Sequence, residues 1–154
     1  MALDLATVTG WAMLANGVVT SGSQSFARHA GNQTRAPDHP GASFSMFDRW
    51  LHAKIIEDKP AVIVAEGAAG FFKSATAQQM NYGLRSIMLM NACRSGLPVA
   101  TYYPTTVKKF WCGHGFAKKP QMVAETERRF PGINLTDDNE SDAIALMFLH
   151  LSFP

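Results

Sequence analysis

The sequence contains little cysteine, no long hydrophobic run and no export signal. Its two cysteines, Cys93 and Cys112, lie far apart and form no CxxC pair, so neither a disulfide framework nor a zinc ribbon is indicated. No apolar segment approaches the roughly 20 residues that cross a bilayer, and the N-terminus lacks a basic region followed by a long apolar stretch. These absences favour a cytoplasmic protein with reduced thiols and no membrane contact.

The composition is that of an ordered chain. The 154 residues are 47% hydrophobic and only 17% charged, which supplies enough apolar side chains for a hydrophobic core. The chain is too short for two lobes of ordinary size. We therefore predict one globular domain that spans residues 1–154.

Charge is distributed unevenly although the net charge is only +2. Residues 101–129 carry six Lys or Arg and two Glu, whereas residues 131–154 carry four acids and no Lys or Arg. A basic segment beside an acidic, metal-binding pocket suits a polyanionic substrate. The alternative is an ordinary solvated surface.

Four acidic side chains fall at informative places in the hydrophobic pattern. Asp4 lies in the opening apolar stretch, Glu66 ends the apolar run 61–65, and Asp138 and Asp142 precede an apolar C-terminal segment. A carboxylate at the end of a buried strand is costly unless a cation compensates for it, and such oxygen donors suit Mg²⁺ or Mn²⁺. The pattern indicates a two-metal nuclease site. Three of these acids also have a purely structural explanation. Glu66 would cap the segment that follows it, Asp138 would be a helix N-cap, and Asp142 would be an exposed acid in the first turn of a helix.

The hydrophobic periodicity predicts alternating strands and helices. Strands are predicted at 3–6, 10–14, 18–26, 61–65 and 98–102, with Asn16-Gly17 as a hairpin turn. Residues 27–41 are polar and rich in Gly and Pro, which predicts a loop that is a candidate DNA-contacting flap. The order strand, helix, strand, helix, strand, ending at residue 102, predicts right-handed parallel crossovers.

Helix boundaries are predicted from capping residues and from proline and glycine. The predicted helices run from an N-cap at Ser43 to Asp58, from 74 to 95, through 107–110, from Pro120 at a first helical position, and from an N-cap at Asp137 or Asp138 over the apolar face that ends at 149.

Four short motifs, taken in order, resemble those of one family. They are residues 3–12 (LDLATVTGWA), 64–66 (VAE), Val107-Lys108 together with 113–121 (GHGFAKKPQ), and 142–146 (DAIAL). The series resembles RuvC-type Holliday-junction resolvases, particularly phage-type members. The resemblance implies an α/β protein of the RNase H-like fold, with a mixed five-stranded sheet in which a three-strand antiparallel meander joins two parallel strands, flanked by helices.

The resemblance also implies an activity and a set of site residues. The expected protein is a metal-dependent, structure-selective endodeoxyribonuclease that resolves four-way (Holliday) junctions by paired nicks, acts as a homodimer, and works in a bacterial host cytosol if it is phage-encoded. Two Mg²⁺ ions per site, or Mn²⁺, are expected at Asp4, Glu66 and Asp142, with Asp138 or Asn139 completing the cage. Residues expected to contact DNA are Phe71, Phe72, Lys73, Lys108, Lys118 and Lys119, of which Lys119 also adds positive charge at the reacting phosphate.

Some of these residues have structural alternatives. Phe71 and Phe72 either stack on opened bases or serve as core or dimer contacts. The helix 74–95 is the expected dimer interface, and its methionines at 80, 88 and 90 are core or interface residues.

The sequence departs from the family pattern at two places. Leu5-Ala6 stands where the family usually has Pro-Gly, and Asn139 stands where many members have an acid. Asp138 lies one helical turn before Asp142, whereas Glu140 points roughly opposite. Asp138 is therefore the first choice for a fourth ligand and Asn139 the second, because Mg²⁺ accepts an amide oxygen.

Other functions remain open at this level. A ribonuclease H-type or branched-DNA nuclease would use the same fold and metal site. A non-catalytic junction-binding protein is supported by Asn139 alone. An actin-like ATPase fragment would need two such lobes to close over a nucleotide, and 154 residues count against it.

Overall fold

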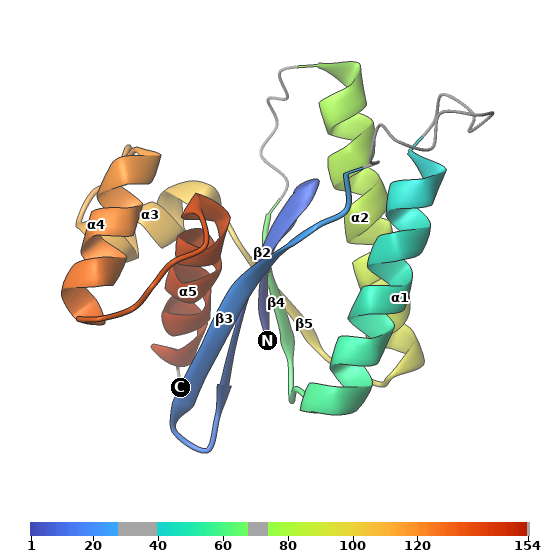
Figure 1. Ribbon diagram of the computed structural model, residues 1–154, viewed down its shortest axis with the longest axis horizontal. Helices are drawn as coiled ribbons and strands as arrows, with labels where there is room; N and C mark the ends of the chain where they lie inside the picture. The colour runs from blue at the N-terminus through green and yellow to red at the C-terminus, as the bar shows by residue number, and fades with distance from the viewer. Residues whose placement is uncertain (28–39, 68–73, 154) are drawn as a thin grey trace.

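A computed structural model describes residues 1–27, 40–67 and 74–153. The elements are, in order, β1 (Ala2–Asp4), β2 (Val8–Ala15), β3 (Val18–Ser25), α1 (Gly41–Asp58), β4 (Ile63–Glu66), α2 (Ala75–Arg94), β5 (Val99–Tyr102), α3 (Pro104–Cys112), α4 (Lys119–Arg129) and α5 (Asp138–Leu151). Figure 1 shows them around a central sheet.

The sheet has five strands in the order β3-β2-β1-β4-β5. β1, β2 and β3 pair antiparallel, and β4 pairs parallel with both β1 and β5. Asn16 and Gly17 turn the β2–β3 hairpin with φ of 52° and 78°, the positive values that a tight hairpin turn requires. The mixed sheet and its hairpin are those predicted from the sequence.

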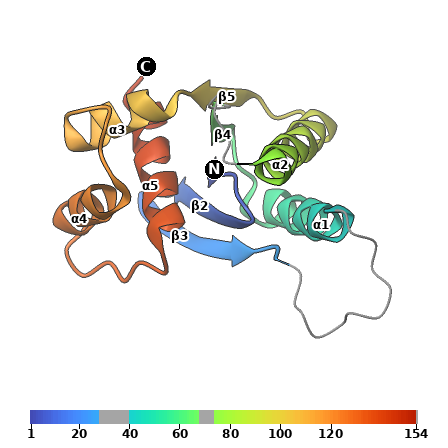
Figure 2. The same ribbon diagram turned by 90° about the horizontal axis from the view of Figure 1, so that it is seen from above.

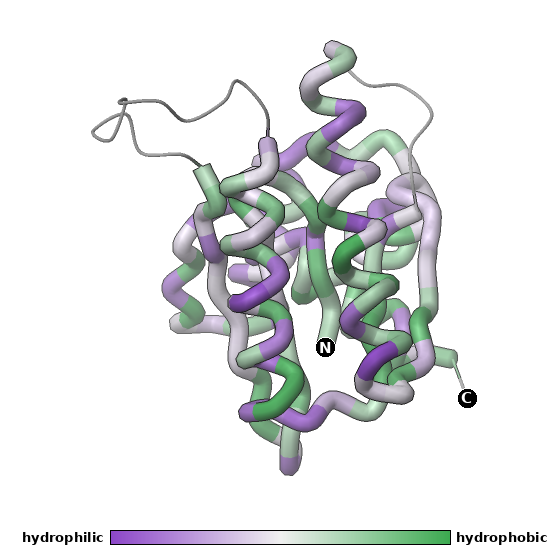
Figure 3. The backbone as a smooth tube through the Cα atoms, turned by 90° about the vertical axis from the view of Figure 1, so that its right-hand side faces the viewer, coloured by the Kyte–Doolittle hydropathy of each residue, from purple (hydrophilic) through white to green (hydrophobic). Residues whose placement is uncertain are grey.

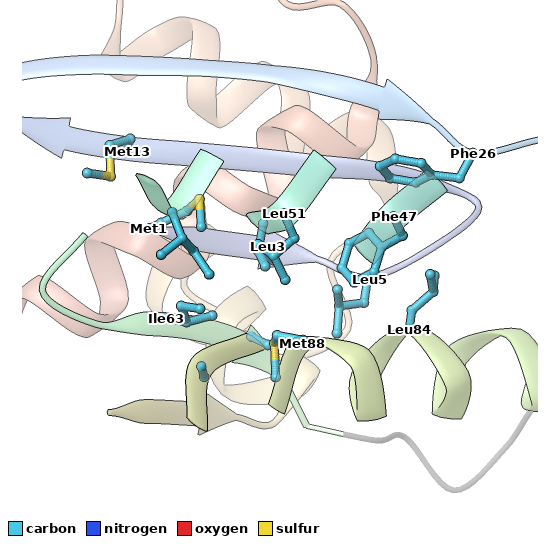
Figure 4. Packing of buried hydrophobic residues seen from close by; sticks show 13 residues of the cluster. Met1, Leu3, Leu5, Met13, Phe26, Phe47, Leu51, Ile63, Leu84 and Met88 are labelled. Atoms are coloured by element: carbon cyan, nitrogen blue, oxygen red, sulfur yellow. The ribbon is translucent and has the colours of Figure 1, made fainter. Parts of the chain in front are cut away.

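Helices cover both faces of the sheet: α1 and α2 lie on one side, and α3, α4 and α5 on the other (Figure 2). Neighbouring strand residues alternate between the two resulting cores, because side chains on a strand point to opposite faces. In β1, Leu3 packs with α1 and α2, whereas Ala2 packs with α5. Figure 4 shows the first core, where Leu3 and Leu5 meet Phe47 and Leu51 of α1 and Leu84 and Met88 of α2.

Hydrophobic and hydrophilic positions are interspersed along α1 and α2 (Figure 3). Met88 is fully buried, Met80 packs against the core at partial exposure, and Met90 is exposed. Among the described helices, none combines the length and hydropathy needed to cross a membrane.

Several predicted boundaries were wrong. α1 begins at Gly41 without a side-chain cap, and Ser43 is a buried helical residue rather than the N-cap. β1 ends at Asp4 instead of residue 6, and β4 begins at Ile63 instead of residue 61. α4 begins one residue before Pro120, so Lys119 belongs to the first turn of the helix.

Candidate active site

Asp4 and Glu66 end neighbouring parallel strands. Asp4 is the last residue of β1 and Glu66 the last residue of β4. The pairing of β1 with β4 aligns Leu3 with Ala65, one residue before each acid. The two carboxylates therefore emerge at the same edge of the sheet.

Gly10 brings the last helix to this edge. It pairs with Asp4 across the β1–β2 ladder, and a Cβ at Gly10 would lie 1.9 Å from the backbone oxygen of Asn139. Since no real side chain fits at that distance, glycine permits the start of α5 to touch β2 directly. Asp142 follows Asn139 by about one helical turn and is carried to the same edge.

Hydrogen bonds to the edge strand fix the start of α5. Asp137 is the N-cap: its carboxylate accepts from the Glu140 backbone N–H at 3.0 Å and from the Ser23 hydroxyl at 2.5 Å. The buried Glu140 carboxylate accepts from the Ser21 hydroxyl at 2.6 Å and from the Thr136 N–H and hydroxyl at 2.7 Å. The carboxylates of Asp137 and Glu140 thus make structural hydrogen bonds. The sequence left either Asp137 or Asp138 as the N-cap of this helix, and the N-cap is Asp137.

A hollow of about 300 Å³ is bordered by four of the five predicted metal ligands, all but Asp138. It is lined by Asp4, Ala6, Glu66, Pro104, Lys108, Lys119, Met122, Asn139 and Asp142. Three carboxylates, one amide and two ammonium groups from five separate elements therefore meet at one place, which is the combination expected of a site for a cation and a phosphate group.

Asp138 lies beside this hollow and forms an ion pair with Lys119. Lys119 occupies the first turn of α4, where a positive side chain opposes the helix dipole. That unfavourable placement is offset by the acids it faces: the hydrogen bond to Asp138, and then the charges of Asp142 and Asp4, raise the Lys119 pKa.

The three carboxylates strongly perturb one another. Burial, followed by repulsion from Glu66 and Asp142, raises the pKa of Asp4 well above its usual 3.8. Burial and the Asp142 charge raise the pKa of Glu66 from 4.5 to about 7, and burial raises that of Asp142 from 3.8 to about 6. Lys108 and Lys119 only partly compensate.

This electrostatic imbalance fits a divalent cation. Within residues 1–27, 40–67 and 74–153, no three acidic, His or Cys side chains are grouped closely enough to hold a metal ion. Mutual repulsion opposes a closer approach of Asp4, Glu66 and Asp142, and a bound cation would remove that repulsion. The donors are hard oxygens, as Mg²⁺ and Mn²⁺ prefer.

The raised pKa values predict a stability that falls with rising pH in metal-free buffer. Because the folded state holds protons on Glu66 and Asp142 at pH values where the unfolded chain has lost them, ionisation between about pH 4 and 7 destabilises the fold. We expect a loss on the order of 1–3 kcal/mol per carboxyl across that range, measured by urea unfolding at pH 5 and pH 8.

Glu66→Gln is the control for this effect, because it removes one of the raised carboxyl titrations of the site and should weaken the pH dependence. Addition of Mg²⁺ at pH 8 should restore stability. A stability that rises between pH 5 and 8 in the wild type but not in Glu66→Gln would contradict the assignment.

The remaining predicted residues are placed as follows. Lys118 is exposed at the N-cap of α4, and Phe71, Phe72 and Lys73 lie outside the described residues. Phe116 was not predicted to have a role; its side chain is 90% exposed three residues before Lys119.

Two further residues near the acids were missed by the sequence analysis. Asn81 donates to the Leu5 backbone oxygen at 3.2 Å, and Arg85 donates to the Glu66 backbone oxygen. Both lie on α2, where polar residues are expected on any solvent-facing side, so no signal in the sequence distinguishes them.

The arrangement is that of an RNase H-like nuclease core: a mixed sheet whose central strands end in acids, with a further acid from the last helix. Among solved structures, Thermus thermophilus RuvC in complex with a Holliday junction substrate superimposes with a TM-score of 0.70 at 17% identity, covering 97% of this chain and 90% of that one. This likeness shows the fold. A comparison with protein-family models found no match.

Curated relatives identify the family. The crossover junction endodeoxyribonuclease RuvC of Parvibaculum lavamentivorans is 30% identical over 149 residues, which cover 94% of this chain and 80% of the relative. That of Zymomonas mobilis is 27% identical over 144 residues, or 92% and 83% of the two chains. The chain belongs to the RuvC family.

Proposed function

We propose that the protein is a metal-dependent endonuclease that resolves four-way DNA junctions by paired nicks. The observation that carries this proposal is the meeting of Asp4, Glu66 and Asp142 with Lys108 and Lys119 around one hollow in a RuvC-family chain. The curated relatives are crossover junction endodeoxyribonucleases, and the Thermus protein was solved with a Holliday junction.

Asp4, Glu66 and Asp142 would hold the metal, proposed as two Mg²⁺ ions per site. When bound, the ions supply an activated water and stabilise the oxygen that leaves in an in-line displacement. The raised pKa values of the three carboxyls mean that binding a cation also releases their protons. No side chain needs to form a covalent bond with the substrate.

Lys119 and Lys108 would hold the phosphate that is cut. Both line the hollow from helices, since Lys119 begins α4 and Lys108 lies in α3. Their positive charges offset the negative charge that develops on the phosphate oxygens. Together with Lys118, both belong to the basic segment 101–129.

Asn139 is the proposed fourth ligand. Asn139 lines the hollow, whereas the carboxylate of Asp138 forms an ion pair with Lys119. Asp138, the first choice from helical spacing, would then hold Lys119 in place before the phosphate arrives.

Asn139→Asp is expected to tighten Mn²⁺ binding about tenfold. A carboxylate is a stronger ligand than an amide, and its negative charge adds attraction for the cation. Asp138→Asn should change Mn²⁺ affinity by less than about threefold while lowering the cleavage rate through Lys119. Isothermal titration with Mn²⁺ measures both variants. A tenfold weaker affinity for Asp138→Asn alone would make Asp138 the ligand instead.

A homodimer would place one such site on each of two strands of the junction. The outer face of α2 exposes Tyr82, Leu89 and Met90, an apolar stripe at helical spacing. A two-fold pairing of this face with its copy is self-complementary, as a symmetric pair of nicks requires.

Cleavage of a labelled synthetic four-way junction tests the function. The matched linear duplex and an RNA–DNA hybrid are run beside it, each with Mg²⁺ or with EDTA. Paired symmetric nicks in the junction alone, lost with EDTA, are the expected result. Cleavage of the RNA strand of the hybrid would identify a ribonuclease H, and a gel shift of the junction without cleavage would identify a binding protein.

A further inference from the structure

The strand ends that carry Asp4 and Glu66 each pair with the strand on their outer side, and Asp4 and Glu66 are not paired with each other. Asp4 pairs with Gly10 of β2, and Glu66 pairs with Tyr102 of β5. Between β1 and β4 the described pairing stops one residue earlier, at Leu3 and Ala65. The ladder between β1 and β4 therefore aligns the two strand ends without pairing Asp4 with Glu66, and contacts from outside this ladder also bear on the separation of the two carboxylates.

Two side chains of α2 bind these strand ends. Asn81 donates to the backbone oxygen of Leu5, directly after Asp4, and Arg85 donates to the backbone oxygen of Glu66 itself. Positions 81 and 85 are one helical turn apart and lie on the same face. One rigid helix thus holds both strand ends at once.

The core fixes the distance of α2 from the strands. Leu84, adjacent to Arg85 in the sequence, is fully buried in the same cluster as Leu3 and Leu5 (Figure 4). A buried helix in a close-packed core cannot shift without cost, so its bonds to the strand ends are held in register.

Asn81 and Arg85 also border a small space beside the acids. Asn81 Oδ1 and Arg85 Nε are buried and have no hydrogen-bond partner among the described residues. The two residues line a hollow of about 80 Å³ together with Asp4, Leu5, Glu66, Gly67 and Pro104. Water takes about 30 Å³ per molecule in the liquid, so this space suits two or three small polar groups and is too small for a nucleotide.

We propose that Asn81 and Arg85 are positioning residues, which set the spacing of Asp4 and Glu66 for metal binding by holding the ends of β1 and β4 from α2. This inference rests on the proposed function. It assigns neither residue to the DNA, because their bonds go to the protein backbone and the adjoining space is too small for a nucleotide.

The test compares Asn81→Leu, Arg85→Met and Arg85→Lys with the wild type. Mn²⁺ binding without DNA is measured from the loss of the free-ion signal in electron paramagnetic resonance. We expect affinity to fall about 10- to 100-fold in Asn81→Leu and Arg85→Met, the range found when groups that orient metal ligands are removed. Arg85→Lys keeps a donor and should recover at least part of the affinity.

Two further measurements separate positioning from other roles. Junction binding in EDTA should stay within about twofold of the wild type, and cleavage should lose kcat with little change in KM. Gln79→Leu and Arg94→Met are matched controls, because Gln79 and Arg94 are exposed on α2. These substitutions make similar changes of polarity and charge at positions that do not bind the strand ends.

Unchanged Mn²⁺ affinity in Asn81→Leu and Arg85→Met would overturn the proposal, as would weaker junction binding in EDTA with Mn²⁺ affinity intact. If Arg85→Met fails to fold, Asn81→Leu decides alone, since it removes one neutral hydrogen bond. A wild type that binds Mn²⁺ but does not cut the junction refutes the proposed function and leaves this comparison valid.

Discussion

Asp4→Asn is expected to abolish junction cleavage and, at the same time, to stabilise the protein. Burial disfavours the ionisation of this carboxylate, and so do the charges of Glu66, Asp142 and Asp138. A neutral amide removes that repulsion, so the free energy of unfolding at pH 8 without metal should rise by on the order of 1–3 kcal/mol. The same change removes one of the proposed metal ligands; a loss of several kcal/mol of transition-state stabilisation lowers the rate about 1,000-fold or more.

Cleavage of the labelled junction and thermal unfolding measure the two effects on one protein sample. Junction binding in EDTA should persist, because the lysines of the basic segment are unchanged. Glu57→Gln, at an exposed position of α1, is the matched control and should alter neither property. Cleavage within tenfold of the wild type would remove Asp4 from the reaction.

Gly10→Ala is expected to damage the site without touching any acid. Its methyl group would meet the Asn139 backbone carbonyl at 1.9 Å, so the start of α5 must move away from β2. Overpacking of this kind costs about 1–3 kcal/mol, and misplacement of a catalytic group by about 1 Å costs about 100-fold in rate. We expect both losses, measured by urea unfolding and by junction cleavage.

Gly22→Ala on β3 is the control for this substitution. There the added methyl group would approach Trp11 side-chain atoms at 3.1 Å, and a side chain yields more easily than a backbone carbonyl. A Gly10→Ala protein that cleaves like Gly22→Ala would show that α5 does not depend on this contact.

The sequence was sufficient to predict the sheet and the principal acids because both depend on local pattern. Asp4 and Glu66 end apolar strands, and the strand–helix order fixes which strands run parallel, so their convergence on one edge follows. The Asn-Gly turn was equally local. Helix starts were less certain: Ser43 has the chemistry of a cap, but packing buries it inside a helix that begins at Gly41.

Tertiary contacts account for what could not be predicted. Helical spacing favoured Asp138 and the family pattern pointed to Asn139, but the ion pair of Asp138 with Lys119 from α4 could not be predicted from either. The contact of Gly10 with Asn139 joins residues far apart in the chain. Asn81 and Arg85 are ordinary polar helix residues until the strand ends are seen beside them.

The order in which the site residues occur along the chain has a consequence for biosynthesis. β1 is central in the sheet, yet its partner β4 begins at residue 63 and the helix that carries Asp142 begins at residue 138. Such non-local contacts form late, because the chain between them must be ordered first. A ribosome-bound nascent chain therefore carries Asp4 long before it carries Asp142, and the candidate site is complete only after α5 has emerged and docked.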